Sequence, residues 1–167
     1  MENHNECMSI VSLEKKPVFN HIIDNVYLGD IVSATNDNII SDIDIIINIS
    51  KSRYMEYEHI MYHHIDIDDN RNENIVKYVD EIINIIKSNS NKKILIHCMN
   101  SVSRSVSLVL FYLMFINYSL KDAYDYLKSK RSQYTKPNIG FSKQLINYEK
   151  EKYGKTTMTV GDFQTGL

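Results

Sequence analysis

Cysteine is scarce in this chain of 167 residues, which contains only Cys7 and Cys98. Two cysteines so far apart in the sequence argue against the disulfide framework that stabilises many small secreted domains. The scarcity therefore predicts a reducing environment, which is the cytoplasm, with the nucleus as an alternative. A cysteine in such an environment stays reduced and available for chemistry.

Long hydrophobic runs are absent as well. No apolar stretch reaches the length of a membrane-spanning helix. The first ten residues, MENHNECMSI, lack the basic region followed by an apolar region that marks a secretory leader. The sequence therefore predicts an intracellular protein with no membrane partner.

A strong charge of one sign is missing too, because the formal net charge is only -2. Extended binding of nucleic acid relies on many Lys and Arg side chains, so nucleic acid is not an expected partner and any attraction of phosphate must be local. The histidines have no CxxC partner or HExxH frame, so neither a metal site nor another cofactor is expected.

Strand-like and helix-like patterns alternate along the chain. Short apolar runs within residues 44–50, 59–68 and 94–96 have the length of strands. Apolar residues recur at helical spacing in residues 32–42, 75–86, 106–116, 120–127 and 141–148. This alternation predicts an α/β fold, with a central, mostly parallel sheet flanked by helices and the site at the carboxyl end of a strand.

The segment ILIHCMNSVSRS, residues 94–105, joins such a strand to the helix that begins near Val106. A loop between a strand and a helix offers main-chain N–H groups and the positive end of a helix dipole, which together bind an anion. Cys98 at this place ionises more readily than a free cysteine. Arg104 can hold two oxygens of one phosphate group. The segment therefore predicts attack of a thiolate on phosphorus.

The pattern His-Cys, five residues, Arg, then Ser resembles the active-site signature of the cysteine-dependent protein phosphatases. The flanking sequence, from about Asn25 to Tyr148, resembles the small, single-domain dual-specificity branch. The resemblance implies the cysteine-phosphatase fold, with the phosphate loop between a strand and a helix. It also implies that phosphorylated proteins are the substrates, hydrolysed at phosphotyrosine and phosphoserine or phosphothreonine through a cysteinyl-phosphate intermediate.

The resemblance assigns a role to each residue of the segment. Cys98 is the nucleophile, His97 tunes its ionisation, and Ser105 eases departure of the sulfur in the second step. Ser105 could instead serve as the N-cap of the following helix. The residues expected to bind the substrate phosphate are Met99, Asn100, Ser101, Val102, Ser103 and Arg104.

The general acid is expected in IDIDDN, residues 65–70, upstream of the cysteine strand. Asp69 matches the family pattern best, and Asp68 remains the alternative. Further along, Asn138 in KPNIGFSKQL matches a family residue that supports the phosphate loop, with a turn-forming role after Pro137 as the alternative.

Ser101 departs from the family pattern, which has glycine at that place. A serine there is expected to strain or reshape the loop. Three other activities stay open: an RNA 5′-triphosphatase, a lipid phosphatase, and a weakly active or inactive protein that binds phosphorylated motifs. Against the first two, the loop lacks both the Thr-His-Gly and the lysines that they usually carry.

The domain organisation is expected to be simple, with one catalytic domain over residues 21–153. An arm over residues 1–20 would precede it, with a short apolar patch at residues 10–13 and a homodimer through this arm as an option. Residues 154–167 are expected to form a flexible tail with little to pack.

Overall fold

The protein is described here by a computed structural model of residues 15–132 and 134–165. Five strands form one sheet in the order β1-β2-β5-β3-β4, in which only the β1–β2 pair is antiparallel. The strands are β1 (Phe19–Ile23), β2 (Val26–Gly29), β3 (Ile45–Asn48), β4 (Met61–His64) and β5 (Ile94–His97). The prediction of a mostly parallel sheet is therefore confirmed, and β5, which leads into the cysteine segment, is its middle strand.

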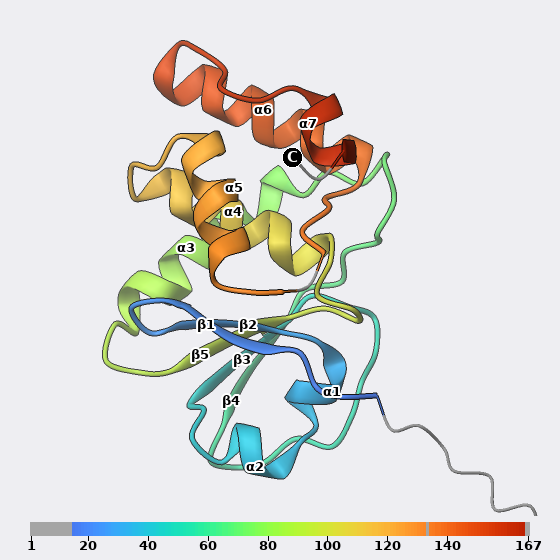
Figure 1. Ribbon diagram of the computed structural model, residues 1–167. Coiled ribbons are helices and arrows are strands. Elements are labelled where there is room, and N and C mark those ends of the chain that lie inside the picture. The colour runs from blue at the N-terminus through green and yellow to red at the C-terminus, as the bar shows by residue number, and fades with distance from the viewer. Residues whose placement is uncertain (1–14, 133, 166–167) are drawn as a thin grey trace, which may run out of the picture.

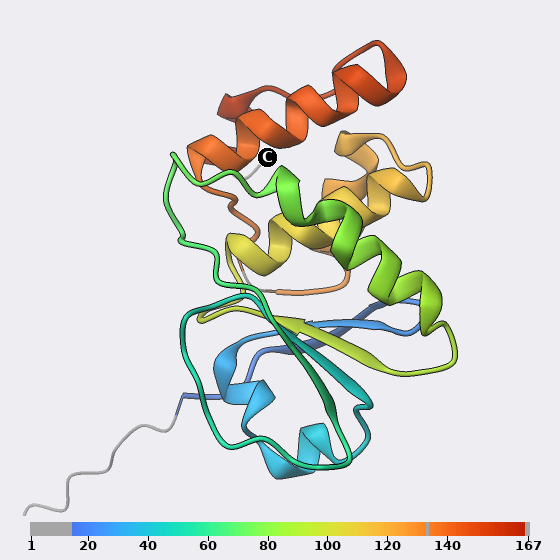
Figure 2. The same cartoon turned by 180° about the vertical axis from the view of Figure 1, so that it is seen from behind.

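Helices cover both faces of the sheet, as Figures 1 and 2 show. The larger layer contains η1 (Val76–Tyr78), α3 (Val79–Ser88), α4 (Arg104–Phe115), α5 (Leu120–Ser129), α6 (Ile139–Tyr153) and α7 (Val160–Thr165). The smaller layer, on the opposite face, contains α1 (Ile31–Ala34) and α2 (Asp37–Ile40).

The alternation of side chains along the strands produces two cores. Ile94 and Ile96 of β5 belong to the large cluster under α3–α7, whereas Leu95 belongs to the small cluster under α1 and α2. Successive residues of a strand point to opposite faces, so a continuous apolar run is needed where both faces are covered. All four residues of β5 are buried, which fixes the start of the cysteine segment rigidly.

The helix after this segment is apolar on all sides because it lies inside the larger layer. Ten of its residues, from Ser105 to Met114, are buried. It contacts β2, β5, α3, α5 and α6. The helix α4 is therefore held in place by elements of both the sheet and the helical layer.

Two expectations about secondary structure are wrong. Residues 32–42 form two short helices rather than one, because the side chain of Asn36 caps α2 and interrupts the first helix. The tail after Gly154 also packs, since it carries α7 with Phe163 fully buried against Tyr124. One aromatic residue in a polar segment gives no periodic pattern, so the sequence did not reveal this helix.

The N-terminal arm was expected over residues 1–20, and most of it, with the apolar patch at residues 10–13, lies outside the described residues. Its last residues enter β1, which begins at Phe19. The homodimer through the arm stays a prediction. Within residues 15–132 and 134–165, no helix is both long and apolar enough to cross a bilayer.

Candidate active site

The loop between β5 and α4 lies at the carboxyl end of the middle strand. Among the described residues, no hydrogen bond uses the main-chain N–H groups of residues 99–103. Unbonded N–H groups ahead of a helix N-terminus form a concave site for an anion. The loop therefore has the form of a cradle for a phosphate group.

Cys98 is buried at the start of this loop, with only 2% of its surface exposed. Its Sγ atom lies 3.1 Å from the Oγ atom of Ser105, a fully buried residue in the first turn of α4. When the sulfur is ionised, the Ser105 hydroxyl must be the donor of this bond. Ser103, not Ser105, occupies the N-cap position, and its side chain makes no capping bond.

Arg104 is the first residue of α4. Its Nη1 atom donates to the main-chain oxygen of Ile67, 3.2 Å away. Its buried Nε atom has no partner among the described residues. Arg104 therefore joins the loop between β5 and α4 to the segment that contains the candidate general acid, and keeps a donor available for an anion.

His97 is fully buried and bonded on both ring nitrogens. Nδ1 lies 3.2 Å from the main-chain oxygen of Cys98, and Nε2 lies 2.7 Å from the hydroxyl of Tyr54. Burial lowers the pKa of His97 from 6.5 to about 4, so the ring is neutral at neutral pH. Because a carbonyl can only accept, Nδ1 carries the proton and Nε2 accepts from Tyr54. His97 thus orients the main chain at Cys98 through neutral hydrogen bonds.

Asp69 is exposed, and its Oδ1 atom accepts a 2.9 Å hydrogen bond from the side-chain nitrogen of Asn138. Both residues line a cavity of about 450 Å³ together with Val102 and Ser103 of the loop. The main-chain N–H of Asn138 donates to Ser103 Oγ at 2.9 Å. Asn138 therefore touches both the candidate acid and the loop.

Asp68 has a different neighbourhood. Its carboxylate forms an ion pair with Lys51 at 2.7 Å, and it does not line the cavity that Asp69 lines. This difference separates the two carboxylates, which the sequence left as alternatives.

The side chain of Asn138 also has the alternative role considered from the sequence. Its Oδ1 atom accepts from the main-chain N–H of Phe141 and so caps α6. One side-chain amide thus holds the start of α6 through its oxygen and Asp69 through its nitrogen.

The other predicted loop residues contact several parts of the chain. The Met99 sulfur accepts from the Ser52 hydroxyl, and exposed Asn100 accepts from Lys15. Ser101 has a φ angle of 56°, in the left-handed region, and its buried hydroxyl has no partner among the described residues. The strain expected from serine at this place is therefore present.

Sequence reasoning missed Arg131, which lies in the basic, turn-rich connection after α5. Its side chain is buried and donates to the main-chain oxygen of Ser101. A single arginine among several lysines in a connection carries no periodic signal, so only the packing reveals it.

Comparison with known proteins agrees with this geometry. Residues 26–151 match the family profile "Dual specificity phosphatase, catalytic domain". The chain is 42% identical to human dual specificity protein phosphatase 14 over 74 residues, which are 44% of this chain and 37% of that protein. It is 34% identical to human dual specificity protein phosphatase 7 over 137 residues, which are 77% of this chain and 32% of that protein.

The chain spans about a third of the length of these two curated relatives. Among solved structures, human DUSP28 superimposes with a TM-score of 0.75 at 21% identity, covering 83% of this chain and 97% of that one. At that level of identity the superposition shows a shared fold only. The profile, which covers most of the chain, shows more: this protein belongs to the dual specificity phosphatase catalytic-domain family.

Proposed function

We propose that this protein is a phosphoprotein phosphatase that hydrolyses phosphotyrosine and phosphoserine or phosphothreonine through a cysteinyl-phosphate intermediate. The observation that carries the proposal is the Cys98 sulfur, 3.1 Å from the Ser105 hydroxyl, inside a loop with unbonded N–H groups. Family membership also favours this activity over RNA 5′-triphosphatase activity, lipid phosphatase activity or mere binding of phosphorylated motifs.

In the first step, the Cys98 thiolate attacks phosphorus and a sulfur–phosphorus bond forms as the ester bond breaks. The loop N–H groups and the Arg104 guanidinium stabilise the negative charge on the equatorial oxygens. Asp69 gives its proton to the departing oxygen, because an alkoxide or phenoxide leaves more easily when it is protonated.

In the second step, Asp69 takes a proton from a water molecule that attacks the phosphocysteine. The sulfur–phosphorus bond breaks and the electron pair returns to sulfur. The Ser105 hydroxyl donates to the departing thiolate, for which its 3.1 Å separation from Sγ is suitable. Inorganic phosphate leaves, and the enzyme is restored.

A matched pair of variants tests the assignment of the acid. Asp69→Ala should slow hydrolysis of an alkyl phosphate by about 10²–10⁴-fold, and hydrolysis of an activated aryl phosphate much less. Asp68→Ala removes the same charge from the neighbouring position, where the carboxylate pairs with Lys51. It should slow hydrolysis of both substrates only slightly and to the same extent. Equal slowing of both substrates by Asp69→Ala would place the acid elsewhere.

The substrate class is tested by three substrates measured side by side: a phosphotyrosine peptide, a phosphothreonine peptide and RNA with a 5′-triphosphate. We expect turnover of both peptides and none of the RNA. Turnover of the RNA alone would contradict the proposal.

The cellular setting follows from the nucleophile. Cys98 is the only cysteine among the described residues, so no disulfide protects it there. A thiolate nucleophile is lost on oxidation. We therefore place the protein in a reducing compartment, the cytoplasm or the nucleus, with phosphorylated proteins as its partners.

A further inference from the structure

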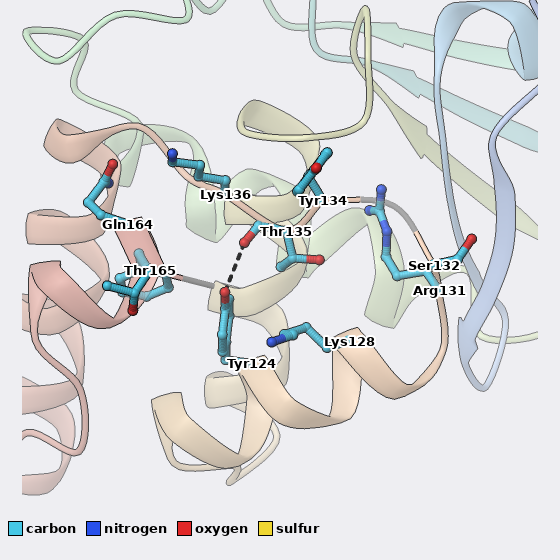
Figure 3. A pocket seen from close by; sticks show the side chains of 10 residues that line it. Tyr124, Lys128, Arg131, Ser132, Tyr134, Thr135, Lys136, Gln164 and Thr165 are labelled. Carbon is cyan, nitrogen blue, oxygen red and sulfur yellow. Dashed lines mark hydrogen bonds between the residues drawn. The ribbon is translucent and has the colours of Figure 1, made fainter. Parts of the chain in front are cut away.

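Arg131 is the most unusual charged side chain in the larger helical layer. It follows α5, is 6% exposed and lines a cavity between α5 and α7 (Figure 3). Its Nη2 atom donates to the main-chain oxygen of Ser101. Its Nε and Nη1 atoms are buried and have no partner among the described residues.

A buried arginine with so few partners does not stabilise the fold. A buried guanidinium stabilises a fold only when its donors are satisfied, because its desolvation is costly. Here a single carbonyl accepts from it within the described residues, and no ion pair with it is found there. Packing alone therefore does not explain the arginine.

The acceptor of its one hydrogen bond is the strained residue of the catalytic loop. Ser101 has a φ angle of 56°, and a residue with a Cβ atom pays a conformational cost in this region that glycine does not. Without an external contact, the loop would relax toward a conformation that serine prefers. The bond from Arg131 opposes that relaxation because it fixes the orientation of the Ser101 carbonyl.

Arg131 begins a segment that supports three successive loop residues. After the bond to Ser101, the main-chain N–H of Lys136 donates to the oxygen of Val102 at 3.0 Å, and that of Asn138 donates to Ser103 Oγ. Of these three bonds, only the one to Ser101 comes from a side chain. It is therefore the one that a substitution can remove while the course of the main chain is kept.

Arg131 keeps its positive charge in this buried position, where Cys98 and Asp30 are close enough to act on it. Burial lowers the pKa of Arg131 to about 10, and the nearby Cys98 and Asp30 oppose that shift, so the guanidinium stays charged at neutral pH.

We propose that Arg131 is a positioning residue of the catalytic loop: it holds the Ser101 carbonyl, keeps Ser101 in its left-handed conformation, and places a second positive charge near Cys98. This proposal rests on the proposed function. It makes Arg131 the element that lets the loop carry serine where the family pattern has glycine.

The first test replaces Arg131 by methionine, which keeps much of the volume and removes the charge. Arg131→Met should lower kcat/KM by about 10- to 100-fold, the size expected for the loss of a hydrogen bond from a charged donor. It should also slow the alkylation of Cys98 by iodoacetamide at neutral pH, because a positive charge near the sulfur is lost. Lys130→Met is the matched control, because Lys130 is exposed and lies over the Tyr126 ring. It removes the same charge one residue away and should change neither quantity.

The second test uses the cavity of about 400 Å³ that Arg131 lines together with Tyr124, Lys128 and Phe163. Truncation of Arg131 to alanine opens a path from this cavity toward the Ser101 carbonyl. Guanidinium ion at a concentration too low to denature the protein should then restore part of the activity of Arg131→Ala. The same concentration of potassium ion should restore none, and neither salt should activate the wild type.

The third test removes the strain. Ser101→Gly should tolerate the loss of Arg131 better, so the reduction in kcat/KM from Arg131→Met should be several-fold smaller in the Ser101→Gly background. Equal reductions in both backgrounds, together with an unchanged rate of Cys98 alkylation, would contradict the proposal.

If Arg131→Met does not fold, Arg131→Lys is the variant to test in its place. Lysine keeps the positive charge but lacks the planar guanidinium group, so this variant should keep the rate of Cys98 alkylation and lower kcat/KM. Unfolding of both variants would contradict the proposal by making Arg131 a core residue. The alkylation measurement needs no turnover, so a wild type that hydrolyses no phosphopeptide would defeat the proposed function while leaving the role of Arg131 testable.

Discussion

Replacing His97 by glutamine should flatten the dependence of stability on pH in mildly acidic solution. Burial lowers the pKa of His97 to about 4 in the folded protein, whereas an exposed histidine in the unfolded chain has the ordinary value of 6.5. Between these values the unfolded chain binds a proton that the folded protein does not. Stability is therefore complete above the unfolded value and is lost as the pH falls toward about 4.

The magnitude follows from the gap between the two pKa values, 6.5 and about 4. At about 1.4 kcal/mol per pKa unit, the full effect is about 3 kcal/mol. Acidification from about pH 7 to about pH 5 should lower the free energy of unfolding by about 2 kcal/mol of this total. This is a large share of the net stability of a single domain, about 5–15 kcal/mol.

Urea unfolding curves at these two pH values measure the effect. His97→Gln lowers stability at neutral pH, because the contact with Tyr54 changes, but it should lose about 2 kcal/mol less than the wild type on acidification. His59→Gln makes the same change at an exposed histidine and should follow the wild type. Equal losses for the wild type and His97→Gln would refute the claim that His97 is buried in its neutral form.

Three further predictions concern the site and the tail. Ser105→Ala should slow breakdown of the phosphocysteine by about 10- to 100-fold, because the thiolate leaves without its donor, and a burst of product should appear in rapid-mixing kinetics. Asn138→Ala should cost about 1 kcal/mol of stability through loss of the α6 cap and should slow alkyl phosphates more than aryl phosphates, measured by chemical unfolding and by kcat/KM. Phe163→Ala should cost about 3–5 kcal/mol in thermal unfolding, and a value below about 1 kcal/mol would mean that α7 does not pack as described.

The sequence predicted most of the fold because its strands and helices have strong periodic patterns. A strand that is buried on both faces leaves a continuous apolar run, as in β3 and β5. A helix that is buried on one face leaves apolar residues at helical spacing, as in α3. The tail was misjudged because the packing of α7 depends on one aromatic residue and a long-range contact. Such contacts leave no local pattern.

The candidate site was predictable in so far as it is contiguous in sequence. Cys98, Arg104 and Ser105 lie within one strand–loop–helix unit, so the sequence alone suggested the roles that we propose for them. Asp69 was preferred over Asp68 only through the family pattern, because adjacent carboxylates differ only in their tertiary neighbours, and its role as the general acid stays a prediction. Arg131 was missed for the same reason.

The central claim is that the sulfur at position 98 accepts a phosphoryl group. The most direct measurement is mass spectrometry of the protein quenched in acid within the first turnover of an aryl phosphate. Ser105→Ala is the variant to use, because the intermediate should accumulate in it. We expect one added phosphoryl group, on the peptide that contains Cys98, and none in Cys98→Ser. A phosphoryl group on any other residue, or continued turnover by Cys98→Ser, would contradict it.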